Sequence, residues 1–301
     1  MQQAPITNEE LLDHLTTIAT DGVDIFLLEE GTVRLVVIHG TTLVNQMAAN
    51  HGLSGTGARL LGEAYLLTAL AGSTLKNEEN LGLLLESSGP VRGVSVDVNG
   101  GGQIRGYLLS PVAEGDAMGE GTLEIVRTSA DRPRPVRGQI AFPEGTSVSG
   151  ALEYYFQLSE QTPTGITVQI YTTTQGDIFG AAALLVQAMP GADLDRFAVI
   201  REVAQEISGL GHAFAEGTTA AEVVRTLFAD SEPELIATRR AEFYCSCSRE
   251  RFQSFLCALP AEERQDILEN GPFPLITTCH NCSSNYQFTR DELRQMFESS
   301  S

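Results

Sequence analysis

Two closely spaced pairs of cysteines near the C-terminal end have residue types and spacing suited to metal chemistry: Cys245 with Cys247, and Cys279 with Cys282. Neither pair can surround a metal ion alone, but together they supply four thiolates, the donor set of a closed tetrahedral Zn²⁺ site. The stretch between them, 248–278, is long enough for two short helices that fold back and bring the pairs together. The sequence therefore predicts one Zn²⁺ ion bound by these four cysteines.

Other metal sites fit the pattern less well. Iron–sulfur clusters use different cysteine spacings, and a catalytic zinc needs an open coordination position, which four thiolates do not leave. His280 lies inside the second pair and is expected to be an exposed bystander. The flanking aromatic residues are expected to cover the sulfurs and limit access of water: Phe243, Tyr244, Tyr286 and Phe288.

The single residue between Cys245 and Cys247 makes the first pair unusual. A disulfide closed over one residue is a tight ring, and strained disulfides are labile and more oxidising. Thiolates are also the form that oxidants attack, and a metal module this small depends on its metal to fold. The chemistry thus permits either a structural metal site or a redox switch. Cys257 is expected to be a buried, inert thiol, with a resolving cysteine as the alternative.

Composition excludes several classes of protein. The net charge of −20, with Lys76 as the only lysine, argues against nucleic-acid binding, which requires clustered cations. The glycine loop at 52–57 lacks both the third glycine of a dinucleotide fingerprint and the Gly-Lys-Ser/Thr ending of a phosphate loop, so no ATP site is expected. Five cysteines confined to the last fifth do not resemble a secreted disulfide framework. With no visible signal peptide or membrane span, we expect a protein of the reducing cytoplasm.

The pattern of elements before the cysteines predicts an α+β domain over residues 1–180, with antiparallel sheets crossed by helices. Its first helix is expected to start in a capping box of Thr7 and Glu10. Alternating apolar runs and turn residues predict strands at 23–28, 33–38, 81–86, 91–98, 103–109, 122–128, 136–141 and 166–173, and apolar helical stripes predict helices at 7–21, 43–50, 58–75 and 147–161.

Residues 181–238 are predicted to be mainly helical. Ala181–Met189, Asp193–Leu210 and a helix capped by Thr219 and Glu222 are short and separated by glycines, and short helices are marginal unless they dock onto something. The pattern alone leaves open whether they form part of a rigid core. Residues 239–301 are predicted to form the small metal module.

The cysteine motifs also carry a resemblance to a known family. Cys245-Ser-Cys247-Ser-Arg-Glu-Arg, Cys279-His-Asn-Cys282 and Asn285-Tyr-Gln-Phe288 resemble the redox-regulated 33-kDa heat-shock chaperones of bacteria and some organelles. Weaker matches extend the resemblance over essentially the full length: Leu60-Leu-Gly-Glu-Ala, Leu75-Lys76, Ile104-Arg-Gly-Tyr107 and Tyr155–Gln161 before Pro163-Thr164. Cys257 and the scarcity of lysine depart from the family pattern.

This resemblance implies an ATP-independent holdase, not an enzyme, that binds unfolding client proteins during oxidative stress. It implies that Cys245, Cys247, Cys279 and Cys282 hold zinc in the reduced, inactive form. It further implies that oxidation forms the disulfides Cys245–Cys247 and Cys279–Cys282, releases zinc and unfolds a metastable helical linker, and that the active form is a homodimer. The short helices of residues 181–238 match that linker, so the resemblance favours a linker over a rigid core for this segment.

Two other functions remain alternatives. A thiol–disulfide oxidoreductase would use Cys279 and Cys282, but it requires the pair at the start of a helix after a strand, in a thioredoxin-like βαβ unit. The neighbouring sequence does not supply that unit. A zinc-ribbon nucleic-acid binder is disfavoured by the net charge of −20.

Overall fold

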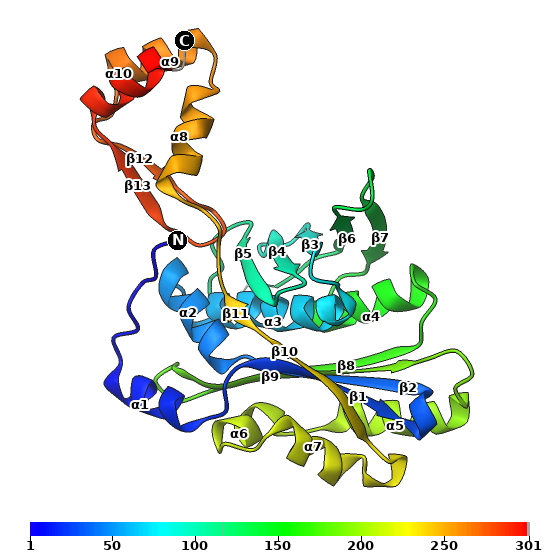
Figure 1. Cartoon of the computed structure of the whole chain (residues 1–301). Coiled ribbons are helices and arrows are strands. Elements are labelled where there is room, and N and C mark those ends of the chain that lie inside the picture. Colours follow the sequence, from blue (N-terminus) through cyan, green and yellow to red (C-terminus); the bar gives the residue numbers. More distant parts are fainter. Residues whose placement is uncertain (116, 300–301) are drawn as a thin grey trace.

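Two antiparallel sheets and two layers of helices form the body of the protein, and a small module stands at one edge (Figure 1). The computed structural model describes residues 1–115 and 117–299. A six-stranded sheet lies on one side. Three helices lie between the two sheets: α2 (Thr41–His51), α3 (Gly55–Ala71) and α4 (Val148–Leu158). Three others cover the outer face of the five-stranded sheet: α5 (Leu194–Glu206), α6 (Leu210–Ala215) and α7 (Ala220–Leu227). The predicted α+β class with antiparallel sheets is confirmed.

The five-stranded sheet has the order β10-β1-β2-β9-β8, and each neighbouring pair is antiparallel. Its strands are β1 (Gly22–Leu28), β2 (Val33–His39), β8 (Thr164–Thr172), β9 (Ile178–Ala188) and β10 (Glu234–Arg240). The predicted strands at 23–28, 33–38 and 166–173 are confirmed as β1, β2 and β8. A short 3₁₀ segment, η1 (Glu29–Gly31), joins β1 to β2.

The six-stranded sheet has the order β11-β5-β4-β3-β6-β7. Its strands are β3 (Glu79–Ser87), β4 (Gly93–Asn99), β5 (Gln103–Leu108), β6 (Gly121–Ser129), β7 (Val136–Phe142) and β11 (Glu242–Phe243). All five strands predicted between residues 81 and 141 are confirmed. β11 is joined to β5 in parallel through only two residue pairs.

The helices of the body are α1 (Glu9–Thr17), α2 (Thr41–His51), α3 (Gly55–Ala71) and α4 (Val148–Leu158), with the 3₁₀ segment η2 (Gly72–Thr74) after α3. The predicted helices are confirmed with shifted ends. α1 is capped by Asn8, whose side chain accepts from the Leu11 amide, so the predicted Thr7–Glu10 capping box is wrong. α3 is buried on nearly every side because it lies between the two sheets.

The helix predicted over Ala181–Met189 is wrong, because all of these residues except Met189 belong to β9. That strand lies between β2 and β8, so both of its edges are paired, and helices pack on both of its faces. Ala183 and Leu185 face the helices between the sheets, while Leu184 and Val186 face α5–α7. A strand buried on both faces is a continuous apolar run, which periodicity cannot distinguish from a buried helix.

After β9 the chain forms α5 (Leu194–Glu206), α6 (Leu210–Ala215), α7 (Ala220–Leu227) and the 3₁₀ segment η3 (Ala229–Ser231) before it enters β10. The capping box of Thr219 and Glu222 is confirmed. Phe197, Ile200 and Phe214 pack on the outer face of the five-stranded sheet. β10 was not predicted, because its sequence combines exposed Leu235 and Ile236 with charged residues.

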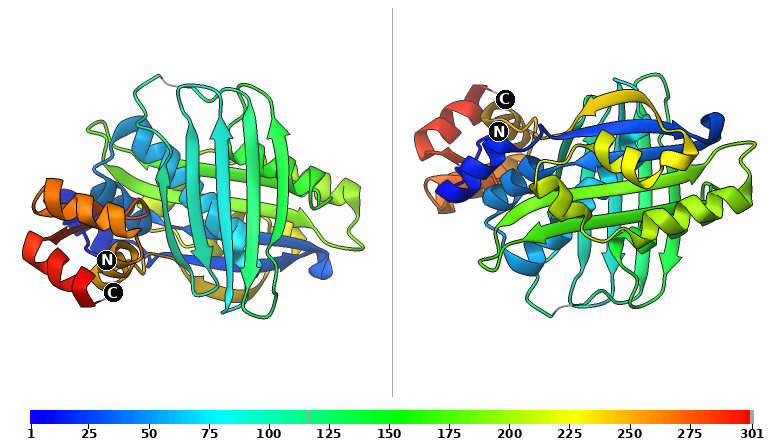
Figure 2. Two further views of the ribbon diagram at one scale, coloured as in Figure 1. Left: turned by 90° about the horizontal axis from the view of Figure 1, so that it is seen from above. Right: turned by 90° about the horizontal axis from the view of Figure 1, so that it is seen from below.

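The C-terminal module contains α8 (Arg249–Cys257), α9 (Ala261–Asn270), the hairpin of β12 (Leu275–Thr278) and β13 (Asn285–Phe288), and α10 (Arg290–Ser299). It stands beside the edge of the six-stranded sheet, close to the N-terminal end of the chain (Figures 1 and 2). Within the described part of the chain, none of the helices combines the length and apolar character that crossing a bilayer requires.

Candidate metal centre

The four predicted cysteines lie together. Cys245 and Cys247 follow β11, and Cys279 and Cys282 lie in the turn between β12 and β13. All four side chains are buried, and their sulfur atoms lie within 4.8 Å of one another. The Cys245 and Cys279 sulfurs are 3.8 Å apart, and those of Cys247 and Cys282 are 3.3 Å apart. We call these four residues the cysteine cluster.

The geometry of the cysteine cluster fits a tetrahedral metal ion. Four sulfurs at about 2.3 Å from a central Zn²⁺ form a tetrahedron with edges of about 3.8 Å, close to the measured sulfur–sulfur distances. All five cysteines of the chain are free thiols in this structure. Both contacts join a member of the first pair to a member of the second, which is the arrangement a shared metal needs.

A tight turn between β12 and β13 orients the sulfurs of Cys279 and Cys282. The Ser283 amide donates to the Cys279 carbonyl at 2.7 Å, and the Cys279 amide donates to the Ser284 carbonyl at 2.9 Å. Ser283 adopts a positive φ of 53°, which lets the chain reverse within a few residues. The turn thereby holds Cys279 and Cys282 on the same side, facing the first pair.

Aromatic side chains shield the cysteine cluster as predicted, with one exception. The Tyr286 hydroxyl lies 3.2 Å from the Cys247 sulfur and donates to the Cys247 carbonyl at 3.1 Å. Phe243 and Phe288 are also buried. Tyr244 is 42% exposed, so the prediction that it covers the sulfurs is wrong. Successive residues of an extended segment point to opposite sides, and Tyr244 points away from the side on which Phe243 and Cys245 are buried.

Proton affinities within the cysteine cluster are unequal. Hydrogen bonds from the Cys279 and Cys282 thiols lower the pKa of Cys245, and the Arg105 guanidinium also lowers it. The hydrogen bond with Cys245 raises the pKa of Cys279 and raises the pKa of Cys282 to about 11. One sulfur can therefore carry a charge that the others stabilise as thiols. A second thiolate needs a cation beside it, and a bound divalent metal supplies that charge.

Residues of the body that hold the cysteine cluster were missed by the sequence analysis. The Asn50 side chain donates to the Cys282 carbonyl at 2.9 Å, and a His51 ring nitrogen lies 3.0 Å from the Ser283 hydroxyl. Arg105 reaches the Cys245 sulfur at 3.8 Å. These residues lie more than a hundred positions from the cysteines, so spacing could not reveal them. The Ile104-Arg-Gly-Tyr107 segment, already noted in the family resemblance, was the available signal.

Two further predictions concern residues near the cysteine cluster. His280 is exposed, as expected, and its ring lies edge-on to Tyr107 with centroids 5.6 Å apart. Cys257 is half-buried rather than fully buried, and its sulfur contacts the Met296 carbonyl at 3.7 Å. It packs on the module side of the core, away from the four clustered sulfurs.

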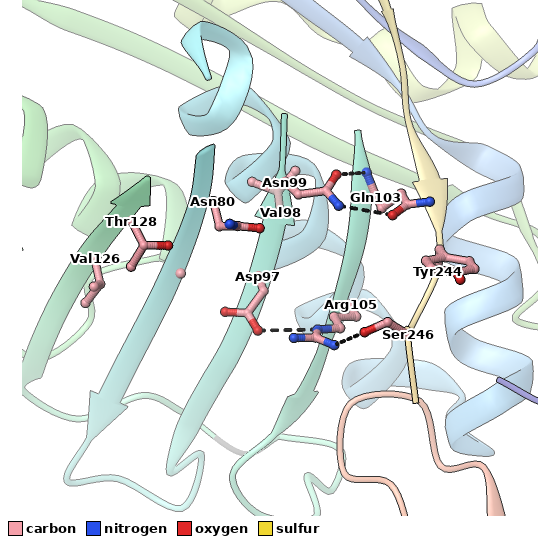
Figure 3. Close-up of a pocket in the computed structure, with 11 residues that line it drawn as sticks. Asn80, Asp97, Val98, Asn99, Gln103, Arg105, Val126, Thr128, Tyr244 and Ser246 are labelled. Atoms are coloured by element: carbon pink, nitrogen blue, oxygen red, sulfur yellow. Dashed lines mark hydrogen bonds and ion pairs between the residues drawn. The ribbon is translucent and has the colours of Figure 1, made fainter. Parts of the chain in front are cut away.

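A polar cavity of about 440 Å³ lies beside the cysteine cluster, on the outer face of the six-stranded sheet. Figure 3 shows Asp97, Arg105 and Ser246 in line across its floor, with Tyr244 at one side. The arrangement places a charged side chain of the sheet between solvent and the first cysteine pair.

A two-sheet α+β body with a tetracysteine module at its sheet edge defines a recognisable class of protein. The family model described as Hsp33 protein matches residues 21–289. The chain therefore belongs to the Hsp33 family, which is a family of chaperones.

Individual relatives agree with this assignment. The 33 kDa chaperonin of Bacillus subtilis (strain 168) is 27% identical over 279 residues, covering 89% of this chain and 94% of that protein. That of Bacillus cytotoxicus is 25% identical over 280 residues, covering 89% and 96%. The crystal structure of the 33 kDa chaperonin from Thermotoga maritima superposes with a TM-score of 0.81 at 23% identity, covering 93% of this chain and 99% of that one. The chain is thus assigned a chaperone function, which entails binding client proteins.

Proposed function

We propose that this protein is a redox-regulated, ATP-independent holdase of the cytoplasm that binds unfolding proteins under oxidative stress. The observation that carries the proposal is the buried cysteine cluster, four free thiols within 4.8 Å of one another in a chaperone-family chain. Free cysteines at this spacing suit a reducing compartment and can respond when it becomes oxidising.

In the reduced form we assign Cys245, Cys247, Cys279 and Cys282 as ligands of one Zn²⁺ ion. The ion, when bound, keeps all four sulfurs as thiolates and joins two segments that lie far apart in the sequence. The chain contributes shielding through Tyr286 and Phe288, and positioning through the hairpin turn. Because α9 has no buried residue of its own, the module depends on this centre for much of its stability.

Oxidation would form the disulfides Cys245–Cys247 and Cys279–Cys282. Formation of each disulfide transfers two electrons from the two thiolates of a pair to one hydrogen peroxide molecule, which takes up two protons and is reduced to two molecules of water. The sulfur contacts in the structure run between the pairs, whereas these disulfides join sulfurs within each pair at about 2.05 Å. Both turns must therefore rearrange, and the geometry that holds the metal cannot survive the reaction.

The released segment would be the linker, which we place within residues 181–238 between the α+β domain (1–180) and the metal module (239–301). β9 is an interior strand, so the part available for release begins after it, with α5, α6 and α7. These helices cover apolar residues on the outer face of the five-stranded sheet, among them Phe26, Leu35 and Leu184. Exposure of that surface would bind clients, and the active form would be a homodimer.

The thiol–disulfide oxidoreductase alternative is not favoured. Cys279 and Cys282 lie in the turn of a β-hairpin rather than at the start of a helix. Their side chains are 7% and 0% exposed, so a substrate disulfide has no direct approach to either sulfur.

The proposal is tested by measuring zinc release, thiol content and suppression of client aggregation together, before and after peroxide at raised temperature. We expect peroxide to release one zinc, remove four thiols and switch on aggregation suppression. Cys279→Ser should abolish this response. Cys257→Ser is the matched control and should retain it. Full aggregation suppression by the reduced, zinc-loaded protein would contradict regulation by oxidation.

A further inference from the structure

Arg105 is the cation, among the described residues, that contacts a sulfur of the cysteine cluster. It lies on β5, in the six-stranded sheet of the body, and its guanidinium Nη1 reaches the Cys245 sulfur at 3.8 Å and the Ser246 hydroxyl at 3.3 Å. Its Nε lies 3.5 Å from a carboxylate oxygen of Asp97, the residue directly opposite on β4. Figure 3 shows the Arg105 side chain between Asp97 of the sheet and Ser246, the residue that separates Cys245 from Cys247.

The backbone connection at this place is short. β11 pairs with β5 through two residue pairs, with hydrogen bonds from the Glu242 amide to the Gly102 carbonyl and from the Tyr244 amide to the Ile104 carbonyl. Beyond Tyr244 the main chain leaves the sheet toward the cysteine cluster. Two pairs at a sheet edge make a weak ladder, so side chains must hold this segment in place.

The side-chain contacts between the body and the module differ in whether their strength depends on the redox state of the cysteines. Phe243 is buried and faces Tyr65, with ring centroids 6.3 Å apart. That contact is apolar and does not depend on the state of the sulfurs. Asn50 and His51 contact a carbonyl and a hydroxyl, which are neutral in any redox state. Arg105 differs from all of these, because a hydrogen bond from a cation is strong to a thiolate and weak to a neutral sulfur.

We propose that Arg105 is a positioning residue that ties the first cysteine pair to the six-stranded sheet only while Cys245 carries thiolate charge. A disulfide sulfur is uncharged, so formation of Cys245–Cys247 removes this charge-assisted hydrogen bond. The segment is then held to the body by the two-pair ladder of β11 and the apolar contact of Phe243. Arg105 thereby couples the redox state of the cysteine cluster to the stability of β11. That strand connects the cluster to β10 and the linker. This inference rests on the proposed function for its physiological setting.

The first test compares Arg105→Gln with Arg137→Gln. Arg137 lies on β7 of the same sheet and also pairs with a carboxylate, that of Glu124, at 3.0 Å. Amide hydrogen exchange is followed in residues 242–248 of the full-length, zinc-loaded, reduced protein. We expect Arg105→Gln to accelerate this exchange about tenfold, the scale of one lost charge-assisted hydrogen bond, and Arg137→Gln to leave it unchanged. Arg105→Lys, which keeps the charge, should recover part of the protection.

The second test repeats the comparison after peroxide treatment. The proposal requires that Arg105→Gln and wild type then exchange at the same rate, because the contact is already lost. An equal effect of the substitution in both states would mean that Arg105 is a redox-independent structural residue and would overturn the proposal, as would no effect in the reduced state. Ser246→Ala gives an independent check if Arg105→Gln fails to fold, since it removes the second acceptor and should accelerate exchange in the reduced form only.

The two proposals fail in different ways. If wild-type protein neither releases zinc nor gains client binding with peroxide, the proposed function fails. The Arg105 contact can still be judged in the reduced, zinc-loaded protein, in which we expect Arg105→Gln, but not Arg137→Gln, to accelerate exchange in residues 242–248. If wild type switches normally while Arg105→Gln matches Arg137→Gln, the Arg105 proposal alone fails.

Discussion

The body and the metal module obtain their stability by different means. The body buries α3 between two sheets, with Leu61, Tyr65 and Leu66 fully inaccessible to solvent. The module has a few buried side chains around the sulfurs, such as Phe288 and Leu293, and a helix, α9, with none. Apolar burial is insensitive to redox conditions, whereas a thiolate centre is not. One chain therefore combines a body whose stability is independent of redox conditions with a module whose stability depends on them.

Metal removal under reducing conditions should separate the two regions most strongly. Structural zinc contributes about 10–16 kcal/mol to the folding of small zinc modules. We expect chelation to remove hydrogen-exchange protection from β12, β13 and α10 while β2 and β9 stay protected. Magnesium chelation alone serves as the control and should change neither region. Protection that persists in the module after complete zinc removal would contradict its dependence on the metal.

A core substitution in the body should produce the opposite pattern. Leu61 lies in α3 with 0% exposure, and Leu61→Ala should lower the free energy of unfolding by about 2–5 kcal/mol. Zinc content should not change. Leu158→Ala, on α4 with 61% exposure, is the matched control and should change stability by less than about 0.5 kcal/mol. Calorimetry with zinc analysis checks both; loss of zinc in Leu61→Ala would show that the regions are not separable.

Acid should loosen the contact between the body and the linker helices. His39 on β2 stacks on Phe214 of α6, with ring centroids 4.8 Å apart. Burial, with a smaller contribution from His14, lowers the pKa of His39 to about 4. An unfolded histidine titrates near pH 6.5, so below that pH the unfolded chain takes up a proton that the folded chain refuses. Stability therefore falls as the pH falls from about 6.5 to 4, by about 2 kcal/mol at pH 5.

Denaturant unfolding at pH 7.5 and pH 5 measures this effect. His39→Gln, which cannot take up the proton, should show a smaller loss between the two pH values than wild type. His212→Gln is the control because His212 is an exposed residue of α6, and it should follow wild type. Parallel pH profiles for wild type and His39→Gln would refute the assignment.

The smallest expected effect concerns the cap of α7. The Thr219 hydroxyl accepts from the Glu222 amide at 3.3 Å, and the Glu222 carboxylate accepts from the Thr219 amide at 2.8 Å. Thr219→Ala should cost about 1 kcal/mol and lower the temperature at which peroxide activates the protein. Ser147→Ala removes the corresponding cap of α4 and should cost a similar amount without moving that temperature. Equal shifts in both variants would argue against a special role for the linker helices.

Sequence patterns predicted most of the body and the composition of the cysteine cluster. The alternation of apolar and polar residues identified β1 to β8. Each of these strands either packs against different surroundings on its two faces or has clear turn residues at its ends. It failed for β9, where Ala181–Val186 are apolar on both faces, and for β10, whose apolar residues are exposed. The four cysteines were found by type and spacing alone. Arg105 and Asn50 were not, because the packing of β5 and α2 beside the metal module, and not their place in the sequence, brings them to the cysteine cluster.

The positions of β9 and β10 in their sheet have a consequence for recovery after stress. β10 is an edge strand paired only with β1, whereas β9 has neighbours on both sides. A segment that leaves the sheet at β10 thus remains attached through β9, and its return is an intramolecular reaction. For short flexible connections the effective concentration is in the millimolar range and does not fall on dilution. A bound client would compete with a displaced segment of constant local concentration, so weakly held clients would be the first to leave once reducing conditions return.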